Sequence, residues 1–467
     1  MTKGSTSLPH SQDEVVYLFQ AKVLSTGNLY LPSLPGRLRF FFDHEFVVNN
    51  GKWYGKYSPG QSIAFLPAMS VGAPWLANAL AGGVTLLLLF LLAHRFFSLP
   101  TAMLTALLFS LSPFSVLMSA SFLSHQTAQL LTVLFFLALL RGVTSDGASR
   151  SKRWSAVAGF AGGAIFVVRP YNALVLLPFA AIYASHFLTL RGRSWRRRLE
   201  PLLWFALPAA ALAALNLGYN LALTGHPLRF PYQVYSRLDF VGFGLRGVEW
   251  GSSFGPTEAK ANVIRNWRAL RSLLFAWPSD YLAAAIPLAF LSRRRVLALF
   301  LLALLPLQVL AYALYFHPGT FMGPRYWYEA IWVLPLLTAE GTVVAFAWLR
   351  RLLRRPWIWA VFATGMLMLL CLSLGWDLWL LPAFRGYNRM SRAQLSPLQR
   401  PALVFVPSVD RWQDYGRYFI LQSPGLDDDV IFARDQGRHN VWKNRLPVPN
   451  EELIRYFPTR HVYVIVR

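Results

Sequence analysis

The chain is poor in charged residues, and acidic residues are the scarcest of them. Asp, Glu, Lys and Arg make up 14% of its 467 residues, against about 25% in an ordinary soluble domain. Asp and Glu number 21 against 45 Lys and Arg, which gives a net charge of +24, and 55% of the residues are hydrophobic. This composition excludes an ordinary soluble domain and is typical of a polytopic membrane protein, whose spans each need about 20 apolar residues.

Other absences narrow the class of protein further. The single cysteine, Cys371, excludes an intrachain disulfide and a cysteine-based metal site. No glycine-rich nucleotide loop, Walker pattern or HExxH motif is present, so an enzyme of this kind would use a substrate already in the membrane. The first ten residues are polar and no apolar stretch follows them, which does not fit a cleavable signal peptide.

The apolar runs predict an all-α polytopic protein with about ten spans. We place the spans near 75–96, 99–118, 126–141, 154–169, 171–189, 201–221, 275–292, 296–316, 327–348 and 356–378. Basic residues cluster between apolar runs, as at 196–198 and 293–295. Membrane topology explains these clusters better than a nucleic-acid groove does, so no nucleic-acid partner is expected, and the basic side is predicted to be cytoplasmic.

The remaining segments then share the opposite, extracytoplasmic side. Residues 1–74 are predicted to form an external loop with juxtamembrane helices, among them a short interfacial helix at 63–69. Residues 75–380 form the transmembrane domain, with a long external loop at 222–274. The strand-like runs at 401–407, 427–434 and 461–467 alternate with helix-like segments, so residues 381–467 are predicted to form a small soluble α/β domain.

Scarce acidic residues gather before the first span, at Asp13, Glu14, Asp43 and Glu45. Asp13 and Glu14 head a run whose apolar residues recur at roughly helical spacing. An acidic pair at a helix N-terminus is also explained by the helix dipole, which favours negative charge there. On this stretch alone, a structural and a catalytic interpretation both remain open.

Lys56 lies later in the same external segment, and ionisable residues also lie where the other external loops meet the spans, at His125, Arg169, Arg325 and Glu329. Such groups are costly near the apolar phase and are functional candidates for that reason. Four of these residues have a structural alternative. His125 could be a hydrogen-bonded packing residue, Arg169 could extend its side chain to the interface, and Arg325 could pair with Glu329 four residues later.

The order of these motifs resembles the GT-C-fold glycosyltransferases, the polytopic enzymes similar to protein mannosyltransferases and the lipid A aminoarabinose transferase. Residues 13–17, Asp-Glu-Val-Val-Tyr, and 27–30, Gly-Asn-Leu-Tyr, look like their first external loop. Residues 56–60 resemble the turn before their second span, 119–125 lie where they have a second external loop, and 323–326 resemble a late-loop motif of bacterial members. The resemblance covers most of residues 11–380.

The resemblance implies transfer of a sugar from a polyprenyl-phosphate carrier to a lipid, glycan or protein acceptor. It places this reaction at the extracytoplasmic face of a bacterial inner membrane. Asp13 would be the general base, with Glu14 the next candidate. Arg325 and Lys56 would stabilise the leaving phosphate. The predicted substrate-binding set is Lys56, Tyr57, His125, Arg169, Arg325 and Tyr326.

The chain departs from the family pattern at two places. Only twelve residues precede Asp13, where similar proteins have a membrane span. His125 stands where many relatives carry an acidic residue, so no metal and no other cofactor is expected. Two other functions stay open: a transporter or flippase of lipid-linked substrates, although no inverted repeat or paired broken helices are evident, and a non-catalytic scaffold.

Overall fold

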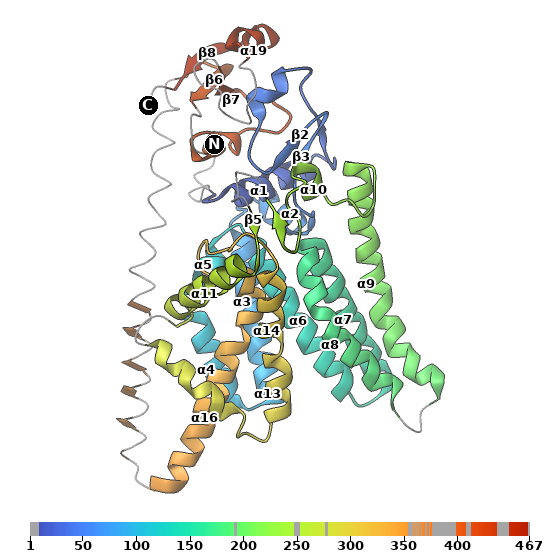
Figure 1. The fold of residues 1–467 in the computed structure, drawn as a ribbon, viewed down its shortest axis with the longest axis vertical. Helices are drawn as coiled ribbons and strands as arrows, with labels where there is room; N and C mark the ends of the chain where they lie inside the picture. Colours follow the sequence, from blue (N-terminus) through green and yellow to red (C-terminus); the bar gives the residue numbers. More distant parts are fainter. Residues whose placement is uncertain are drawn as a thin grey trace.

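The computed structural model is a helical bundle capped at one end by two three-stranded sheets (Figure 1). It describes residues 9–190, 194–246, 253–275, 279–353, 398–407, 412–436 and 448–465, with isolated positions between 357 and 375. Six helices in these parts are long and apolar enough to cross a membrane, or seven with one bent pair. The prediction of a mostly helical chain with several candidate spans is confirmed, whereas the count of ten stays a prediction.

The bundle is built from helices of 8 to 30 residues. They are α3 (Leu76–Phe96), α4 (Leu99–Ser110), α5 (Pro113–Ala120), α6 (His125–Thr144), α7 (Ala148–Val168), α8 (Pro170–Leu188), α9 (Trp195–Thr224), α13 (Arg295–Leu302), α14 (Leu304–Ala313) and α16 (Val333–Leu353). The predicted span at 99–118 is bent by 60° between α4 and α5. The predicted span at 356–378 lies outside the described residues, apart from isolated positions.

The predicted span at 275–292 differs most from the structure. Its described part consists of a 3₁₀ helix, η3 (Ser279–Ala285), and one turn of α-helix, α12 (Ile286–Ala289). Pro287 stands in the first turn of α12, where a proline can begin a helix but cannot continue one. Both η3 and α12 pack tightly on α16. Gly341 of α16 leaves no room for a side chain, since a Cβ atom there would lie 1.9 Å from the Ala285 carbonyl oxygen.

Glycine also sets the contact between α7 and α9. A Cβ atom on Gly159 would lie 1.9 Å from the Phe205 carbonyl oxygen, and one on Gly163 would lie 2.9 Å from Ala209 Cα. Small residues four apart allow two helix backbones to approach closely inside a membrane. This contact fixes α7, whose C-terminal end leads directly into Arg169.

The basic clusters of the bundle lie away from the sheets. The N-terminal end of α9, the connection before α13 and the C-terminal end of α16 all lie toward the lower end in Figure 1. These ends carry Arg196–Arg198, Arg293–Arg295 and Arg350–Arg351. The strands and α1 lie at the upper end. These three basic clusters therefore lie at one end of the bundle, and which end faces the cytoplasm remains a prediction.

The N-terminal segment forms part of the cap. It contains α1 (Gln12–Ser25), η1 (Leu38–Phe42), α2 (Gly60–Ser70) and an antiparallel sheet in the order β1 (Leu31–Pro32), β3 (Lys52–Gly55), β2 (Val47–Asn49). Helix α1 packs closely on β3, since a Cβ atom on Gly55 would lie 2.7 Å from Val16 Cγ1. The Gly55 N–H also donates to Gln20 Oε1 at 2.8 Å. The packing brings the start of α1 close to the residues that follow β3.

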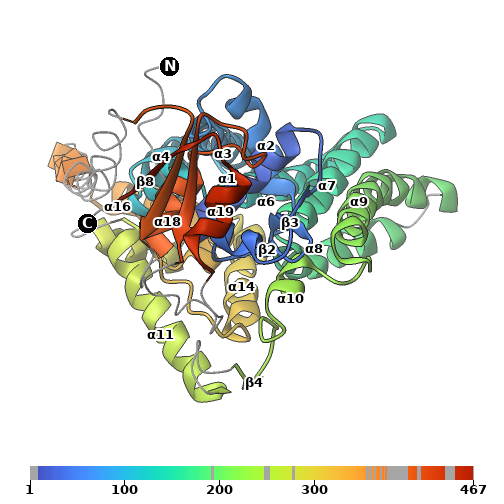
Figure 2. The ribbon, with the colours of Figure 1, turned by 90° about the horizontal axis from the view of Figure 1, so that it is seen from above.

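The C-terminal elements complete the cap. They are β6 (Ala402–Pro407), α18 (Trp412–Phe419), β7 (Val430–Asp435), α19 (Asn450–Tyr456) and β8 (His461–Val464), and their parallel sheet has the order β7-β6-β8. Viewed from above, this sheet and its helices lie over α1 and α3 (Figure 2).

Both ends of the chain contribute to one hydrophobic core. The rings of Phe19 and Phe419 are 5.1 Å apart, and those of Phe41 and Phe405 are 6.0 Å apart. Lys22 Nζ donates to the Gln422 carbonyl oxygen at 2.9 Å, and burial lowers the pKa of Lys22 to about 8. The core and this buried lysine hold the C-terminal sheet against α1.

Candidate functional site

The first turn of α1 holds Asp13 at the boundary between the cap and the bundle. A capping box fixes the start of this helix, in which the Ser11 hydroxyl accepts from the Glu14 N–H and the Glu14 carboxylate accepts from the Ser11 N–H. Asp13 is 16% exposed, and its Oδ2 lies 3.3 Å from Arg325 Nη1. The Tyr57 hydroxyl donates to Asp13 Oδ1. One carboxylate is thus held between a guanidinium and a phenol.

The charge of Asp13 follows from these neighbours. Burial alone would raise the pKa of this carboxyl, but Arg325, the Tyr57 hydrogen bond and Lys56 lower it. The net pKa lies below the ordinary value of 3.8. Asp13 is therefore ionised near neutral pH and can only accept protons and hydrogen bonds.

A tight turn places Arg325 beside Asp13. Gly319 and Gly323 both have positive φ angles, of 68° and 98°, which glycine adopts without steric cost. The Arg325 N–H donates to the Gly319 carbonyl oxygen at 3.1 Å, and Arg325 begins the 3₁₀ helix η4 (Arg325–Trp327). Burial alone would lower the pKa of Arg325, but Asp13 raises it, and the net pKa lies above its ordinary value. Arg325 is a permanent buried cation.

Lys56 supplies a second cation next to this pair. Its ammonium lies 3.6 Å from the centre of the Phe46 ring and 3.5 Å from Asp239 Oδ2. Tyr315 donates its hydroxyl to Asp239 Oδ1 at 2.7 Å. Burial lowers the pKa of Lys56, and the Asp239 carboxylate opposes that shift. Lys56 is thus held by a carboxylate from the long loop at 222–274.

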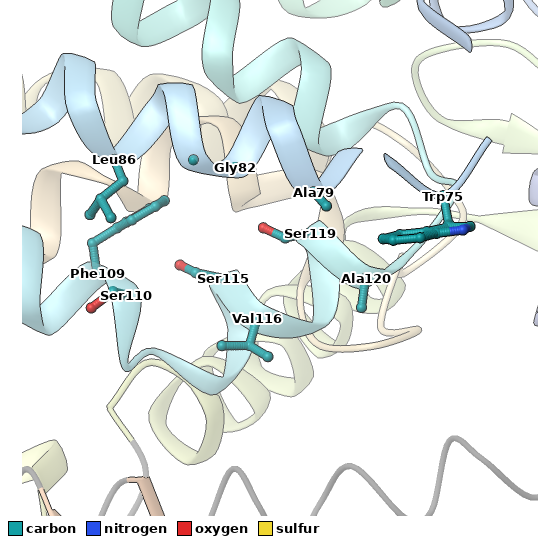
Figure 3. A pocket seen from close by; sticks show the side chains of 11 residues that line it. Trp75, Ala79, Gly82, Leu86, Phe109, Ser110, Ser115, Val116, Ser119 and Ala120 are labelled. Carbon is teal, nitrogen blue, oxygen red and sulfur yellow. The ribbon is translucent and has the colours of Figure 1, made fainter. Parts of the chain in front are cut away.

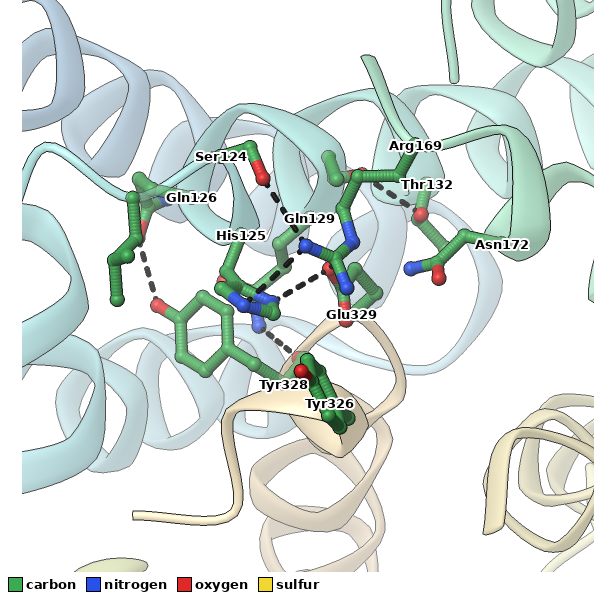
Figure 4. Close-up of polar contacts among 12 residues, drawn as sticks. Ser124, His125, Gln126, Gln129, Thr132, Arg169, Asn172, Tyr326, Tyr328 and Glu329 are labelled. Carbon is green, nitrogen blue, oxygen red and sulfur yellow. Dashed lines mark hydrogen bonds and ion pairs between the residues drawn. The ribbon is translucent and has the colours of Figure 1, made fainter. Parts of the chain in front are cut away.

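Arg169 organises a second polar network, shown in Figure 4. It stands between α7 and α8, and its Nε lies 3.1 Å from Glu329 Oε1. The same carboxylate oxygen lies 3.0 Å from His125 Nδ1. Arg169 also donates to the Ser124 hydroxyl at 3.1 Å and to the Tyr312 hydroxyl at 2.9 Å. The structure therefore pairs Glu329 with Arg169 and His125 rather than with Arg325.

Two tyrosines join the networks into one region. The Tyr17 ring stacks on that of Tyr57 at 4.7 Å, and its hydroxyl is 2.9 Å from the Ser124 hydroxyl. The Tyr326 ring lies between the two guanidinium groups, 5.3 Å from Arg325 Cζ and 5.7 Å from Arg169 Cζ. All the predicted substrate-binding residues and Asp13 thus belong to one continuous polar region beneath the cap.

Glu14 points to a different set of partners. Its side chain is fully buried, with Oε1 accepting from the Phe122 N–H at 3.0 Å. Oε2 accepts from the Ser11 N–H at 3.3 Å. Both oxygens are used by backbone amides, which distinguishes Glu14 from its neighbour Asp13.

Comparison with known proteins identifies the fold. The family model for dolichyl-phosphate-mannose-protein mannosyltransferase matches residues 71–219. The structure matches ArnT from Cupriavidus metallidurans bound to undecaprenyl phosphate, with a TM-score of 0.62 at 14% identity over 99% of this chain and 93% of that chain. The chain has the GT-C fold. The resemblance to GT-C-fold glycosyltransferases drawn from the sequence motifs is confirmed.

Two further solved structures are similar to this chain. The apo form of the same ArnT gives a TM-score of 0.55 at 14% identity over 96% of this chain and 87% of that chain. An oligosaccharyltransferase from Archaeoglobus fulgidus, in complex with Zn and sulfate, gives a TM-score of 0.45 at 14% identity over 90% of this chain and 58% of that chain. No curated protein sequence matches the chain.

Several residues of the candidate site stand outside the motifs found in the sequence. Asp239 is one of three acidic residues within 222–274, and only the scarcity of acidic residues in the whole chain draws attention to it. Tyr312 and Asn172 join the networks through long-range hydrogen bonds. Tyr17 also joins them through such a bond, although it stands in the motif at residues 13–17. Tyrosine is common in this chain, so the identity of Tyr312 alone gave no signal.

A pocket of about 610 Å³ lies apart from this site (Figure 3). It opens between α3 and the bent pair α4–α5, and its lining includes Trp75, Gly83, Phe109 and Ser115. None of the predicted site residues lines it. Within the described residues, no group of three or more His, Cys, Asp or Glu side chains is placed to hold a metal ion. The expectation of no metal stays a prediction.

The buried Glu329 network makes a prediction about stability. We expect Glu329→Gln to lower the free energy of unfolding by about 3–5 kcal/mol, because it leaves the buried Arg169 charge unneutralised. Glu200→Gln is the matched control, since Glu200 pairs with Lys152 at 2.8 Å while 42% exposed. It should cost about 1 kcal/mol or less. Thermal unfolding of the purified proteins measures both, and equal losses would contradict a stabilising role of the network.

Proposed function

We propose that this protein is a membrane glycosyltransferase that moves a sugar from a polyprenyl-phosphate carrier to a lipid, glycan or protein acceptor. The observation that carries the proposal is the ionised Asp13 carboxylate, held by Arg325 and Tyr57 at the cap–bundle boundary. The GT-C fold supports it, since one protein with this fold, ArnT, was solved with undecaprenyl phosphate bound. The proposed location is the bacterial inner membrane, with the site on the extracytoplasmic side.

Asp13 is the proposed general base. The acceptor hydroxyl or amine attacks the anomeric carbon of the sugar, and its proton passes to an Asp13 oxygen. The bond between the anomeric carbon and the carrier phosphate breaks, and its electron pair stays on the phosphate oxygen. Glu14 remains the second candidate for the base, although its two oxygens accept from the Phe122 and Ser11 amides.

Arg325 and Lys56 are the proposed donors to the leaving phosphate. A guanidinium can donate two parallel hydrogen bonds to a phosphate, and the ammonium of Lys56 adds a point charge. A phosphate bound to Arg325 competes with Asp13 for the same guanidinium. Asp13 then loses the contact that lowers its pKa most, because its remaining partners Tyr57 and Lys56 lower the pKa less. Binding of the donor would thus make Asp13 a stronger base.

The second network is the proposed wall of the substrate site. Arg169 and His125 are fixed by Glu329, and Tyr326 lies between Arg169 and Arg325. Buried, mutually bonded polar groups hold their orientation and suit selective binding of sugar hydroxyls or the carrier phosphate. With Tyr57 they complete the proposed binding set, and the proposed reaction uses no metal or other cofactor.

The proposal is tested with the purified full-length protein in lipid nanodiscs. We expect it to cleave at least one donor from a panel of radiolabelled polyprenyl-phosphate sugars and to transfer the label to a lipid, glycan or protein acceptor fraction. Reconstitution in sealed vesicles provides a second readout. Movement of donors across the bilayer with no cleavage of any of them would contradict the proposal and favour the flippase alternative.

A further inference from the structure

Helix α11 (Pro256–Leu273) carries an exposed stripe that the proposed reaction does not use. Lys260, Ile264, Trp267 and Arg271 are spaced by four, three and four residues, so they share one flank of the helix. Ile264 is 41% exposed and Trp267 is 53% exposed, and the two cations are exposed at the ends of the stripe. An apolar centre with a cation at each end is the pattern of a helix that lies in a membrane interface.

The neighbouring flank of α11 holds the helix on the protein. Ala259, Asn266 and Leu270 are buried there. Figure 1 shows α11 running across the direction of α3 and α9, at the level where the bundle meets the cap. The view from above places α11 at the outer edge of the molecule (Figure 2). The stripe therefore belongs to a peripheral helix oriented along the plane in which lipid headgroups would lie.

The charge of α11 indicates the chemistry of its partner. The helix has four basic residues, Lys260, Arg265, Arg268 and Arg271, and one acidic residue, Glu258. The Glu258 carboxylate caps the start of the helix, where its Oε2 accepts a hydrogen bond from the Gly255 N–H at 2.8 Å. We propose that the stripe on α11 docks on anionic phospholipid headgroups, with Trp267 and Ile264 entering the interface between them. Tryptophan is enriched at this depth of the bilayer, and cations bind lipid phosphates there.

Helix α11 is hydrogen-bonded to the segment that leads into the turn before Arg325. Asn262 donates to the Phe316 carbonyl oxygen at 3.1 Å, and Asn266 donates to the Pro318 carbonyl oxygen at 2.7 Å. The Arg325 N–H in turn donates to the Gly319 carbonyl oxygen at 3.1 Å. Docking of α11 on lipid would thus hold the backbone that positions Arg325. This consequence rests on the proposed function, whereas lipid docking itself does not.

The test measures lipid binding by the full-length protein without any assay of sugar transfer. The protein in neutral detergent is titrated with dihexanoyl-phosphatidylglycerol, and with dihexanoyl-phosphatidylcholine as the neutral probe, while thermal unfolding is followed. Each cation near an anionic surface strengthens binding about fivefold. We therefore expect Lys260→Gln/Arg271→Gln to weaken the apparent affinity for phosphatidylglycerol by about 25-fold and to leave the response to phosphatidylcholine unchanged.

A control variant keeps the change in net charge equal. Arg265→Gln/Arg455→Gln removes one cation from the far side of α11 and one from α19, and it should retain the wild-type affinity for phosphatidylglycerol within about threefold. Trp267→Ser should weaken the response to both lipids, because it removes apolar area. Equal losses in the two double variants, or equal stabilisation of the wild type by the two lipids, would overturn the proposal.

Discussion

Asp13→Asn is expected to reduce sugar transfer by about 10²–10⁴-fold, the usual contribution of a general base. The amide has nearly the shape of the carboxylate but cannot take up the proton of the acceptor. Arg325 and Tyr57 lose a charged partner, so a modest loss of stability is also expected. Single-turnover transfer in nanodiscs measures the effect, with thermal unfolding of the same sample as the check on folding.

Glu14→Gln is the matched control for this change. The two carboxylates are neighbours on α1, yet Glu14 accepts from backbone amides. A glutamine keeps one acceptor oxygen and places an NH₂ group against the other backbone amide, so this variant should lose stability. Transfer should stay within about tenfold of wild type, because Asp13 is unchanged. The reverse result, with Glu14→Gln inactive and Asp13→Asn active, would make Glu14 the base. Full activity of both variants would remove a carboxylate base from the mechanism.

The local parts of the site could be predicted because short motifs carry them. Asp13 heads a helix, Lys56 and Tyr57 precede a Pro-Gly helix start, and Arg325 follows a Gly-Pro pair. These features are visible in a few consecutive residues. The residues that hold these side chains in place lie far away in the sequence and cannot be recognised in this way. Asp239 contacts Lys56 across 183 positions of sequence, and a loop without hydrophobic periodicity gives no indication of such a contact.

The predicted alternative pairing of Arg325 with Glu329 shows a physical limit of spacing rules. Residues four apart meet only on a continuous α-helix. Here the chain forms the 3₁₀ helix η4 at Arg325–Trp327 and only then the α-helical turn α15 (Tyr328–Ile331). A 3₁₀ helix has three residues per turn, so the two side chains point apart. Glu329 reaches Arg169 and His125, and Arg325 reaches Asp13.

The packing of the C-terminal sheet on the N-terminal segment also depends on residues that lie far apart in the sequence. Short apolar runs of strand composition predicted strands in the C-terminal region, and a small sheet must bury its apolar face against another layer. The sequence does not say which layer covers that face. The structure uses the N-terminal segment, where Phe19 and Phe41 meet Phe419 and Phe405. The same contact holds α1, and thereby Asp13, at the boundary of cap and bundle.

The second large effect is expected at Arg325. Arg325→Gln should lower kcat by about 10²–10³-fold, because it removes a buried, preorganised donor to the developing phosphate charge. It should also shift the pH dependence. Asp13 must be ionised to accept a proton, so kcat/KM falls as the pH falls through its pKa. Arg325 holds that pKa low against the effect of burial, and without it the pKa rises. The fall in rate should therefore begin at a higher pH.

Arg325→Lys separates the two roles of the guanidinium. Lysine keeps a positive charge near Asp13, so the acid limb of the kcat/KM profile should stay close to that of the wild type. It cannot donate two parallel hydrogen bonds to phosphate, so kcat should still fall. A pH profile from pH 4 to 9 for wild type and both variants distinguishes these effects. If Arg325→Gln lowers kcat while its acid limb stays at the wild-type position, Arg325 does not control the protonation of the base. The coupling between donor binding and the basicity of Asp13 would then be wrong, while the contact between Arg325 and the leaving phosphate would stand.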